Sequence, residues 1–407
     1  MTLRRLGAAA LLSCAATAAA TVPGPTVADP APDAALAVVV EPAATPVAEP
    51  DPVPEPPAPP RPPREVSIVM GGDLLWHNTV WQSAADDAAR TGRGPYDFDP
   101  MFADLRPIIA EADLAICHEE VPFARPGQPL QSYPVFAAPP EVAPWLATMG
   151  FDACTTASNH AVDQGWEGLR HTAGLLERAG IAHVGTFRSP AERRRPVVLD
   201  TAQGVRVGLV AGTYGLNGFP VPEGRPWSVS TWDADNLLRQ ARAARRAGAD
   251  VVVVHVHGGA EYDHDPTAEQ VALVERLTRS PDVDLVLGEH AHVVQPITRV
   301  NGTWVAYGLG NMVAQQEAYR TETYEGVTVR FTFGERPDGR YAVTNAAYVP
   351  TAWNVYGDGG PVRVQRISRA LADGRTSPLS RARLLAARAS IREAVHAQGR
   401  QPELVER

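Results

Sequence analysis

The sequence contains no lysine: all 37 basic residues among its 407 are arginine. This absence excludes Schiff-base chemistry on lysine and a phosphate-binding loop built around a lysine. Three cysteines are too few for a disulfide-rich scaffold or a cysteine-based zinc module. A net charge of -9 offers no broad basic surface and so argues against nucleic-acid binding. What is present, 44% hydrophobic and 20% charged residues, predicts a globular core.

Residues 1–20 have the outline of a secretory signal peptide. Arg4 and Arg5 precede a short apolar run and then small residues, and no apolar stretch in the chain reaches the roughly 20 residues of a membrane-spanning helix. The sequence Leu-Leu-Ser-Cys ending at Cys14 resembles a lipobox, in which Cys14 would be lipidated, whereas residues 18–20 offer an ordinary cleavage site. We therefore expect an exported protein of the cell envelope, either a lipoprotein on the outer face of the cytoplasmic membrane or a secreted protein.

Three further segments follow the signal peptide. Residues 21–64 hold fifteen of the 38 prolines and show no apolar periodicity, which predicts a disordered tether. Residues 65–350 alternate short β-branched runs with amphipathic segments, the pattern of an α/β domain. Residues 351–407 are arginine-rich and predict a C-terminal extension of one or two surface helices, whose basic face we interpret as solvated.

Within the α/β domain, periodicity predicts individual elements. The expected strands are 66–70, 114–117, 153–156, 205–210, 251–256 and 285–287, and the expected helices are 101–112, 141–149, 166–179, 234–247 and 267–279. The later segments 303–307, 327–333 and 341–349 are expected to be strands without intervening helices, and therefore more antiparallel.

Polar residues of the metal-ligand type follow six of these strands. They are Asp73 with His77, His118 with Glu120, Asn159 with His160 and Asp163, His257 with Glu261, His290 with His292, and Asn311. Ligands of open α/β sheets bind outside the carboxyl ends of the strands. The sequence therefore predicts one site at a single sheet edge.

The types of donor atom in these residues indicate which metal ions the site would bind. His290 and His292 flank one residue, so on an extended segment both imidazoles point the same way and can serve two adjacent ions. Carboxylate, amide and imidazole donors suit Zn, Mn or Fe rather than Ca. Two divalent ions about 3.5–4 Å apart would polarise an oxyanion and activate a bridging water. His255 is expected to face away from His257 and to be a core histidine.

These motifs resemble those of the CapA family of bacterial poly-γ-glutamate capsule synthesis, over about residues 65–350. The matching stretches are Gly72-Asp73, His118-Glu119-Glu120-Val121-Pro122, residues 158–165, residues 257–262, residues 288–292 and residues 309–312. The chain departs from the family at His118, Ser158 and Gly258, where the family has Asn, Asn and Trp. The D-x-H opening of metallophosphoesterases proper is also absent, since the nearest histidine is His77. The resemblance implies an α/β fold, a layered calcineurin-like metallophosphoesterase α/β/β/α sandwich with its metal site at the carboxyl ends of the strands.

The resemblance, taken together with donor chemistry, also implies roles for the residues. Asp73 and His292 would hold one metal, with His77 or His118 as a further ligand, and Glu120 would bridge. Asn159, His257 and His290 would hold the second metal. Asn311 would be a metal ligand or line the site. His160 would be the catalytic acid. Asp163 and Glu261 would orient histidine rings.

Two cysteines occupy equivalent points on two strands. Cys117 and Cys154 would form a disulfide in an exported protein, or remain as two buried thiols.

The function expected from the resemblance is that of a metal-dependent hydrolase or transferase acting on an anionic envelope polymer such as poly-γ-glutamate. The alternative is a non-catalytic subunit that binds the polyanion within a membrane capsule-synthesis or export complex. A phosphodiesterase is a third reading, on fold analogy alone. His160 beside Asn159 favours catalysis, because binding alone needs no proton donor.

Overall fold

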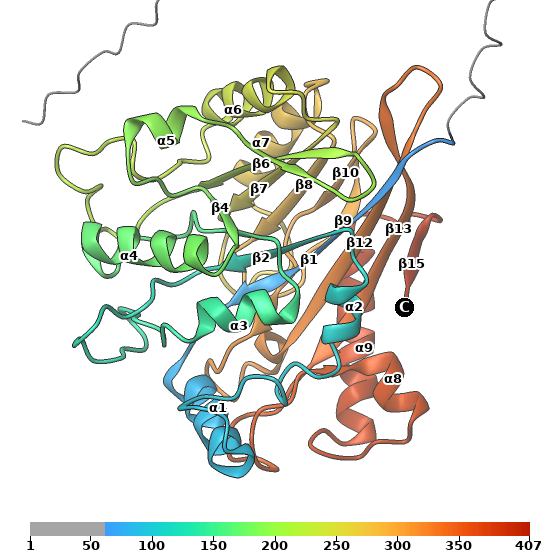
Figure 1. Ribbon diagram of the computed structural model, residues 1–407. Coiled ribbons are helices and arrows are strands. Elements are labelled where there is room, and N and C mark those ends of the chain that lie inside the picture. The colour runs from blue at the N-terminus through green and yellow to red at the C-terminus, as the bar shows by residue number, and fades with distance from the viewer. Residues whose placement is uncertain (1–61) are drawn as a thin grey trace, which may run out of the picture. The chain divides into compact units, whose positions relative to one another are not determined.

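The computed structural model describes residues 62–407, which belong to one compact unit (Figure 1). The predicted signal peptide, Cys14 and nearly all of the predicted tether lie outside the described residues. Among the described residues, no helix combines the length and hydropathy needed to cross a membrane.

Two β-sheets form the centre of the unit. The larger has the strand order β14 (Gln365–Arg366), β13 (Tyr341–Ala352), β12 (Glu325–Glu335), β1 (Glu65–Leu74), β2 (Leu114–Glu119), β3 (Ala153–Thr155) and β4 (Ala182–Val184), with β11 (Asn311–Val313) beside β1 and β15 (Leu404–Glu406) beside β13. The smaller has the order β5 (Val197–Asp200), β6 (Arg206–Thr213), β7 (Val251–His257), β8 (Leu285–Glu289), β10 (Thr303–Ala306) and β9 (Ile297–Val300). Pairing is parallel from β1 to β4 and from β6 through β8 to β10, and antiparallel for β12 and β13.

Strand alternation builds the core between the sheets. Ile68 of β1 joins an apolar cluster with Leu209 of β6 and Val253 of β7, whereas the next residue, Val69, joins the cluster on the outer face of the larger sheet. This switch between successive residues is the period of two expected of a strand buried on both faces.

Helices cover the outer faces of both sheets. They are α1 (Asn78–Thr91), α2 (Arg106–Ala110), α3 (Val142–Met149), α4 (Gly165–Arg178), α5 (Pro190–Arg194), α6 (Ala234–Arg246) and α7 (Ala268–Thr278), and a 3₁₀ turn covers Thr321–Tyr324. Leu146 of α3 and Leu176 of α4 pack on the larger sheet, and Leu237 of α6 and Leu277 of α7 pack on the smaller. The result is the layered α/β/β/α architecture that the sequence led us to expect (Figure 1).

The C-terminal segment contains two helices that bury an apolar face. Leu384 and Ile391 of α9 (Arg381–Val395), with Ile367 of α8 (Ile367–Ala372), join the cluster between the sheets and contact β12 and β13. Arg383 pairs with buried Glu325 at 2.5 Å. Interpreting this segment only as a solvated basic face was therefore incomplete, because the interior residues of both helices complete the core.

The sequence anticipated the major strands but not every element. We did not predict α1, because two positions of its buried face, Ser83 and Asp87, hold polar residues. The helix expected over 101–112 is confined to Arg106–Ala110, preceded by turns and with Pro107 in its first turn. β4 and β11, with three residues each, are too short for periodicity to identify.

Candidate metal centre

Asp73 enters the site near the end of β1, where the strand approaches another backbone closely. A Cβ at Gly72 would stand 2.1 Å from the carbonyl oxygen of Gly310, so only glycine fits there. The Asp73 amide donates to the same carbonyl at 3.0 Å. The carboxylate is fully buried.

Asp73 forms a first group of ligand atoms with His118 at the end of β2 and His257 at the end of β7. His118 Nε2 lies 3.6 Å and His257 Nδ1 lies 3.8 Å from Asp73 Oδ1. The other nitrogen of His118 is held by the Thr155 hydroxyl at 2.8 Å, which fixes the ring. One group therefore joins strands from both sheets.

A second group consists of Glu120, His290 and His292. The two histidines follow β8, and their φ angles are 101° and 58°. Our argument from an extended segment was therefore wrong, because the backbone here is left-handed. The rings still lie close, with centroids 5.9 Å apart. Positive φ at non-glycine residues costs on the order of 1–3 kcal/mol each and is typical of functional sites.

The two groups form one continuous cluster. His292 Nδ1 lies 3.1 Å from Asp73 Oδ2, and His292 Nε2 lies 3.9 Å from Glu120 Oε1. His257 Nε2 lies 3.8 Å from the same Glu120 oxygen. Asp73 and His292 are in contact, but they belong to different groups, whereas we had expected them to share one metal. His257, which we had expected beside His290, lies with Asp73 instead, and Glu120 faces ligands of both groups. His118, which we had treated as an optional ligand, belongs with Asp73.

Several polar atoms of the cluster have no hydrogen-bond partner among the described residues. They are Asp73 Oδ1, both carboxylate oxygens of Glu120, His118 Nε2, His257 Nδ1 and His290 Nδ1. Buried polar atoms are nearly always paired, and lone pairs that converge in a buried site are what a cation satisfies. The donor set therefore fits divalent metal ions.

The pKa shifts of the cluster also fit bound divalent metal ions. Burial lowers the pKa of His118 and of His290 to about 3, so both rings are neutral and have a lone pair available. Burial and Asp73 raise the pKa of Glu120 well above its usual range. Burial opposes the charge of His292, but Glu120 and Asp73 outweigh it and raise its pKa to about 10. The buried carboxylates thus require positive charge at this place.

His160 lies at the edge of the cluster with its own orienting carboxylate. Its Nδ1 donates to Asp163 Oδ2 at 2.7 Å, and the same oxygen accepts from the Phe136 amide at 2.7 Å. The neighbouring Asn159 places its Oδ1 2.8 Å from His257 Nε2. Asn159, which we had expected to be a metal ligand, therefore contacts the cluster through His257 and belongs to neither ligand group. The Nε2 atom of His160 has a long contact, 3.4 Å, with Asn217 Nδ2.

The remaining predicted site residues have different positions. His77 Nδ1 accepts from the Gln315 amide at 3.2 Å, and its ring packs edge-on against Phe136, so it lines the margin and belongs to neither group. Asn311 Oδ1 lies 3.0 Å from His292 Nδ1, so Asn311 positions that ring. Glu261 is exposed and makes no hydrogen bond to a histidine within residues 62–407.

His255 lies on the same side as His257, and our expectation that it faces away was wrong. Residues two apart in a strand share a face. The ring centroids of His255 and His118 are 4.6 Å apart, and those of His118 and His257 are 4.7 Å apart. Neither His255 nitrogen has a hydrogen-bond partner among the described residues, and burial lowers its pKa to about 3.

Sequence reasoning missed three residues of the site. Asn217 accepts from Asn159 Nδ2 at 3.1 Å, and the Tyr214 ring centroid lies 4.6 Å from that of His290. Both follow β6, so the rule that located the other candidates would have found them. Glu289 is buried, and neither of its oxygens has a partner among the described residues. Glu289 lies within the family motif at residues 288–292, next to His290.

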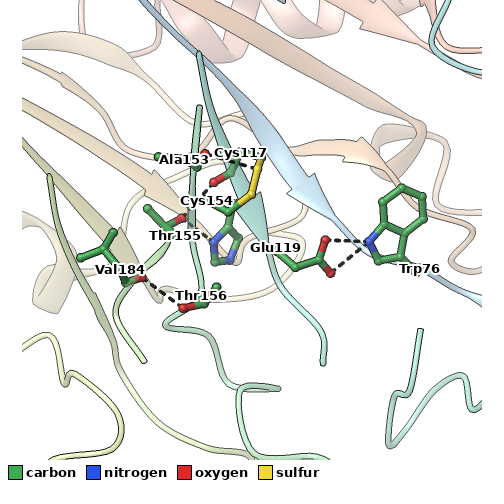
Figure 2. Close-up of a disulfide and its surroundings, with 9 residues drawn as sticks. Trp76, Cys117, Glu119, Ala153, Cys154, Thr155, Thr156 and Val184 are labelled. Atoms are coloured by element: carbon green, nitrogen blue, oxygen red, sulfur yellow. Dashed lines mark hydrogen bonds between the residues drawn. A yellow bond between two sulfur atoms is a disulfide. The ribbon is translucent and has the colours of Figure 1, made fainter. Parts of the chain in front are cut away.

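A disulfide lies beneath the site. Cys117 of β2 and Cys154 of β3 face each other in parallel register, with Cα atoms 4.4 Å apart, and are bonded (Figure 2). Figure 2 also shows Glu119 accepting a hydrogen bond from Trp76 Nε1, at 3.0 Å. The disulfide thus links the strand before Glu120 to the strand before Asn159.

Comparisons with known proteins identify relatives. Residues 67–316 match the family described as bacterial capsule synthesis protein PGA_cap. The chain is 30% identical over 200 residues to the PGA biosynthesis protein CapA of Bacillus subtilis, covering 49% of this chain and 51% of that protein. It is 26% identical over 266 residues to the capsule biosynthesis protein CapA of Bacillus anthracis, covering 63% and 62%. The chain thus spans about half to three fifths of these two relatives.

Other matches are similar to parts of the chain. A probable polyglutamine synthesis accessory protein of Mycobacterium tuberculosis is 28% identical over 302 residues, covering 65% of this chain and 76% of that protein. Among solved structures, a putative 5′-nucleotidase of Staphylococcus aureus matches with a TM-score of 0.46 at 16% identity, covering 70% and 54% of the two chains. A calcineurin-like phosphoesterase of Bacillus subtilis matches with 0.42 at 14% identity, covering 80% and 100%.

Proposed function

The chain belongs to the PGA_cap family of bacterial capsule synthesis proteins, and on that premise we propose that it is a metal-dependent hydrolase or transferase acting on poly-γ-glutamate or a related anionic polymer of the cell envelope. We further propose that it acts after export, as a lipoprotein or a secreted protein. The observation that carries the catalytic proposal is the set of unpaired, converging ligand atoms with His160 and Asp163 beside it.

We assign the candidate ligands to two metal ions according to their positions. Asp73, His118 and His257 would hold one divalent ion, and Glu120, His290 and His292 a second. Bound ions would supply Lewis-acid polarisation of the scissile group and a water of lowered pKa. Asn159 and Asn311 fix the rings of His257 and His292.

We assign proton transfer to His160. Asp163 accepts a hydrogen bond from Nδ1–H, which sets the tautomer and orientation of the ring, so Nε2 would be the atom that exchanges a proton. The protonated ring would give its Nε2 proton to the leaving group, and Asp163 would stabilise the imidazolium before transfer.

One experiment tests this proposal directly. The purified chain is analysed for bound metal and incubated with poly-γ-glutamate and with model phosphoesters, and chain length and released phosphate are followed. We expect bound divalent metal and shortening or transfer of the polymer that chelation abolishes. Stoichiometric metal without turnover of either substrate class would contradict the catalytic proposal.

A second candidate function has one observation in its favour. The Mycobacterium tuberculosis relative is named as an accessory protein, which fits a subunit that binds the polymer without turnover. Such a subunit would bind poly-γ-glutamate, and His160→Ala would leave that binding unchanged.

A further inference from the structure

A cavity of about 320 Å³ lies away from the metal centre. Its walls come from the end of β4, the segment around α5, the edge strand β5, its neighbour β6, and one face of α6. None of its lining residues belongs to the two ligand groups.

Four arginines line this cavity, and no acidic residue does. They are Arg193, Arg194, Arg195 and Arg239. Other arginines of the described chain, such as Arg245, pair with carboxylates. Within residues 62–407 these four form no ion pair with a carboxylate, and the nearby Glu192 is instead bonded to Arg188 and close to His183. In a chain of net charge -9, this is a local concentration of unpaired positive charge.

Arg193 is held in place as an anion-binding side chain would be. Its Nη2 donates to Asn236 Oδ1 at 2.6 Å, and its guanidinium lies over the Phe187 ring, 4.7 Å from the centroid. Its Nη1 is buried with no partner among the described residues. Burial and then the charge of Arg239 lower the pKa of Arg193, so an anion here would relieve both desolvation and repulsion.

The floor of the cavity is apolar, with Val184, Val197 and Leu209 among its lining residues. A guanidinium fork matches a planar carboxylate, and apolar side chains match methylene groups. A chain of carboxylates separated by methylene spacers satisfies both features, whereas free phosphate satisfies only the charge.

We propose that this arginine pocket binds carboxylates of a γ-linked glutamate chain outside the metal centre. This inference rests on the proposed function, which supplies the polymer. A polymer held at a second point has a raised effective concentration at the metal centre.

The test compares two double variants that remove the same charge. Arg194 of α5 and Arg239 of α6 line the pocket and are exposed. Arg242 and Arg246 of α6 are also exposed but do not line the pocket. Binding of fluorescent oligo-γ-glutamate to the full chain is measured in chelator, so that the metal centre does not contribute.

We expect Arg194→Ala with Arg239→Ala to weaken binding by roughly tenfold or more, since each lost charge-assisted hydrogen bond carries that scale. Arg242→Ala with Arg246→Ala should change it by less than about twofold, the scale of a non-specific surface charge effect. If the pocket double variant has a lower melting temperature than the control double variant, the single variants Arg239→Ala and Arg242→Ala are compared instead.

Two results would overturn the inference. Equal weakening in both double variants would show only general electrostatic attraction. Inorganic phosphate that displaces the oligomer at equal carboxylate and phosphate concentrations would show an anion site without preference for the chain. Either result leaves the proposed function standing if the wild type turns over the polymer. Conversely, pocket-dependent binding without any turnover would remove the catalytic proposal alone.

Discussion

His160 donates a hydrogen bond from Nδ1 to Asp163 Oδ2 at 2.7 Å, and it directly follows Asn159, which contacts the metal-ligand cluster. His160→Ala should therefore keep metal content near wild type and lower turnover by roughly 10²–10⁴-fold, the usual contribution of a general acid or base. Metal analysis and initial rates on the same preparations check this. Loss of metal in the variant would make His160 a ligand instead.

His292 contacts both buried carboxylates, so its removal should affect metal and activity together. His292→Ala should lose bound metal and turnover in parallel, because a ligand near both Asp73 and Glu120 disappears. His171→Ala, on α4 and in neither ligand group, is the control and should retain both. Metal content is measured after dialysis. Full metal retention in His292→Ala would contradict the ligand assignment.

Acid should destabilise the metal-free protein because His255 is buried as a neutral ring. Burial lowers its pKa to about 3, whereas an unfolded histidine titrates near 6.5. Between these values the unfolded chain binds a proton that the folded chain does not, so the free energy of unfolding falls as pH falls. His255→Gln should reduce this dependence by up to about 1.4 kcal/mol per pH unit below pH 6, and by less between pH 7 and 6, where an unfolded histidine is only partly protonated. Urea titrations in chelator at pH 7, 6 and 5 measure it, and an unchanged slope would count against the prediction.

The disulfide should contribute to stability through the unfolded state. Cys117 and Cys154 are 37 residues apart in sequence. The double variant Cys117→Ser with Cys154→Ser should lose about 2–4 kcal/mol of unfolding free energy. Urea unfolding of the variant and of the oxidised wild type gives the difference. Two titratable thiols at these positions in the purified wild type would contradict the bond itself.

Adjacent leucines of α9 provide a matched pair. Leu384 is fully buried against the sheets, and Leu385 is 44% exposed. Leu384→Ala should cost about 2–5 kcal/mol, whereas Leu385→Ala should cost much less, since a cavity forms only at the first. Thermal and urea unfolding compare them. Equal, small losses would mean that α9 does not pack on the core.

The sequence allowed us to identify the candidate ligand residues, but not to assign them to two metal groups. Apolar runs that end in Asp, His or Asn located Asp73, His118 and His257, because the carboxyl ends of parallel strands converge. Their assembly into one group depends on how the two sheets face each other, which no local pattern encodes. The left-handed backbone at His290 and His292 was equally hidden, since it is imposed by tertiary structure on residues that do not favour it.

The packing of the C-terminal helices has a practical meaning for the boundaries of the molecule. The family match ends at residue 316 and the resemblance in motifs at about residue 350, yet α8 and α9 fill the inner face of β12 and β13. The segment by which relatives are identified is therefore shorter than the segment that folds cooperatively. A chain cut at about residue 350 would keep every ligand of the cluster and expose the apolar face of β12 and β13 that α8 and α9 cover, so homology alone would choose the wrong fragment to express.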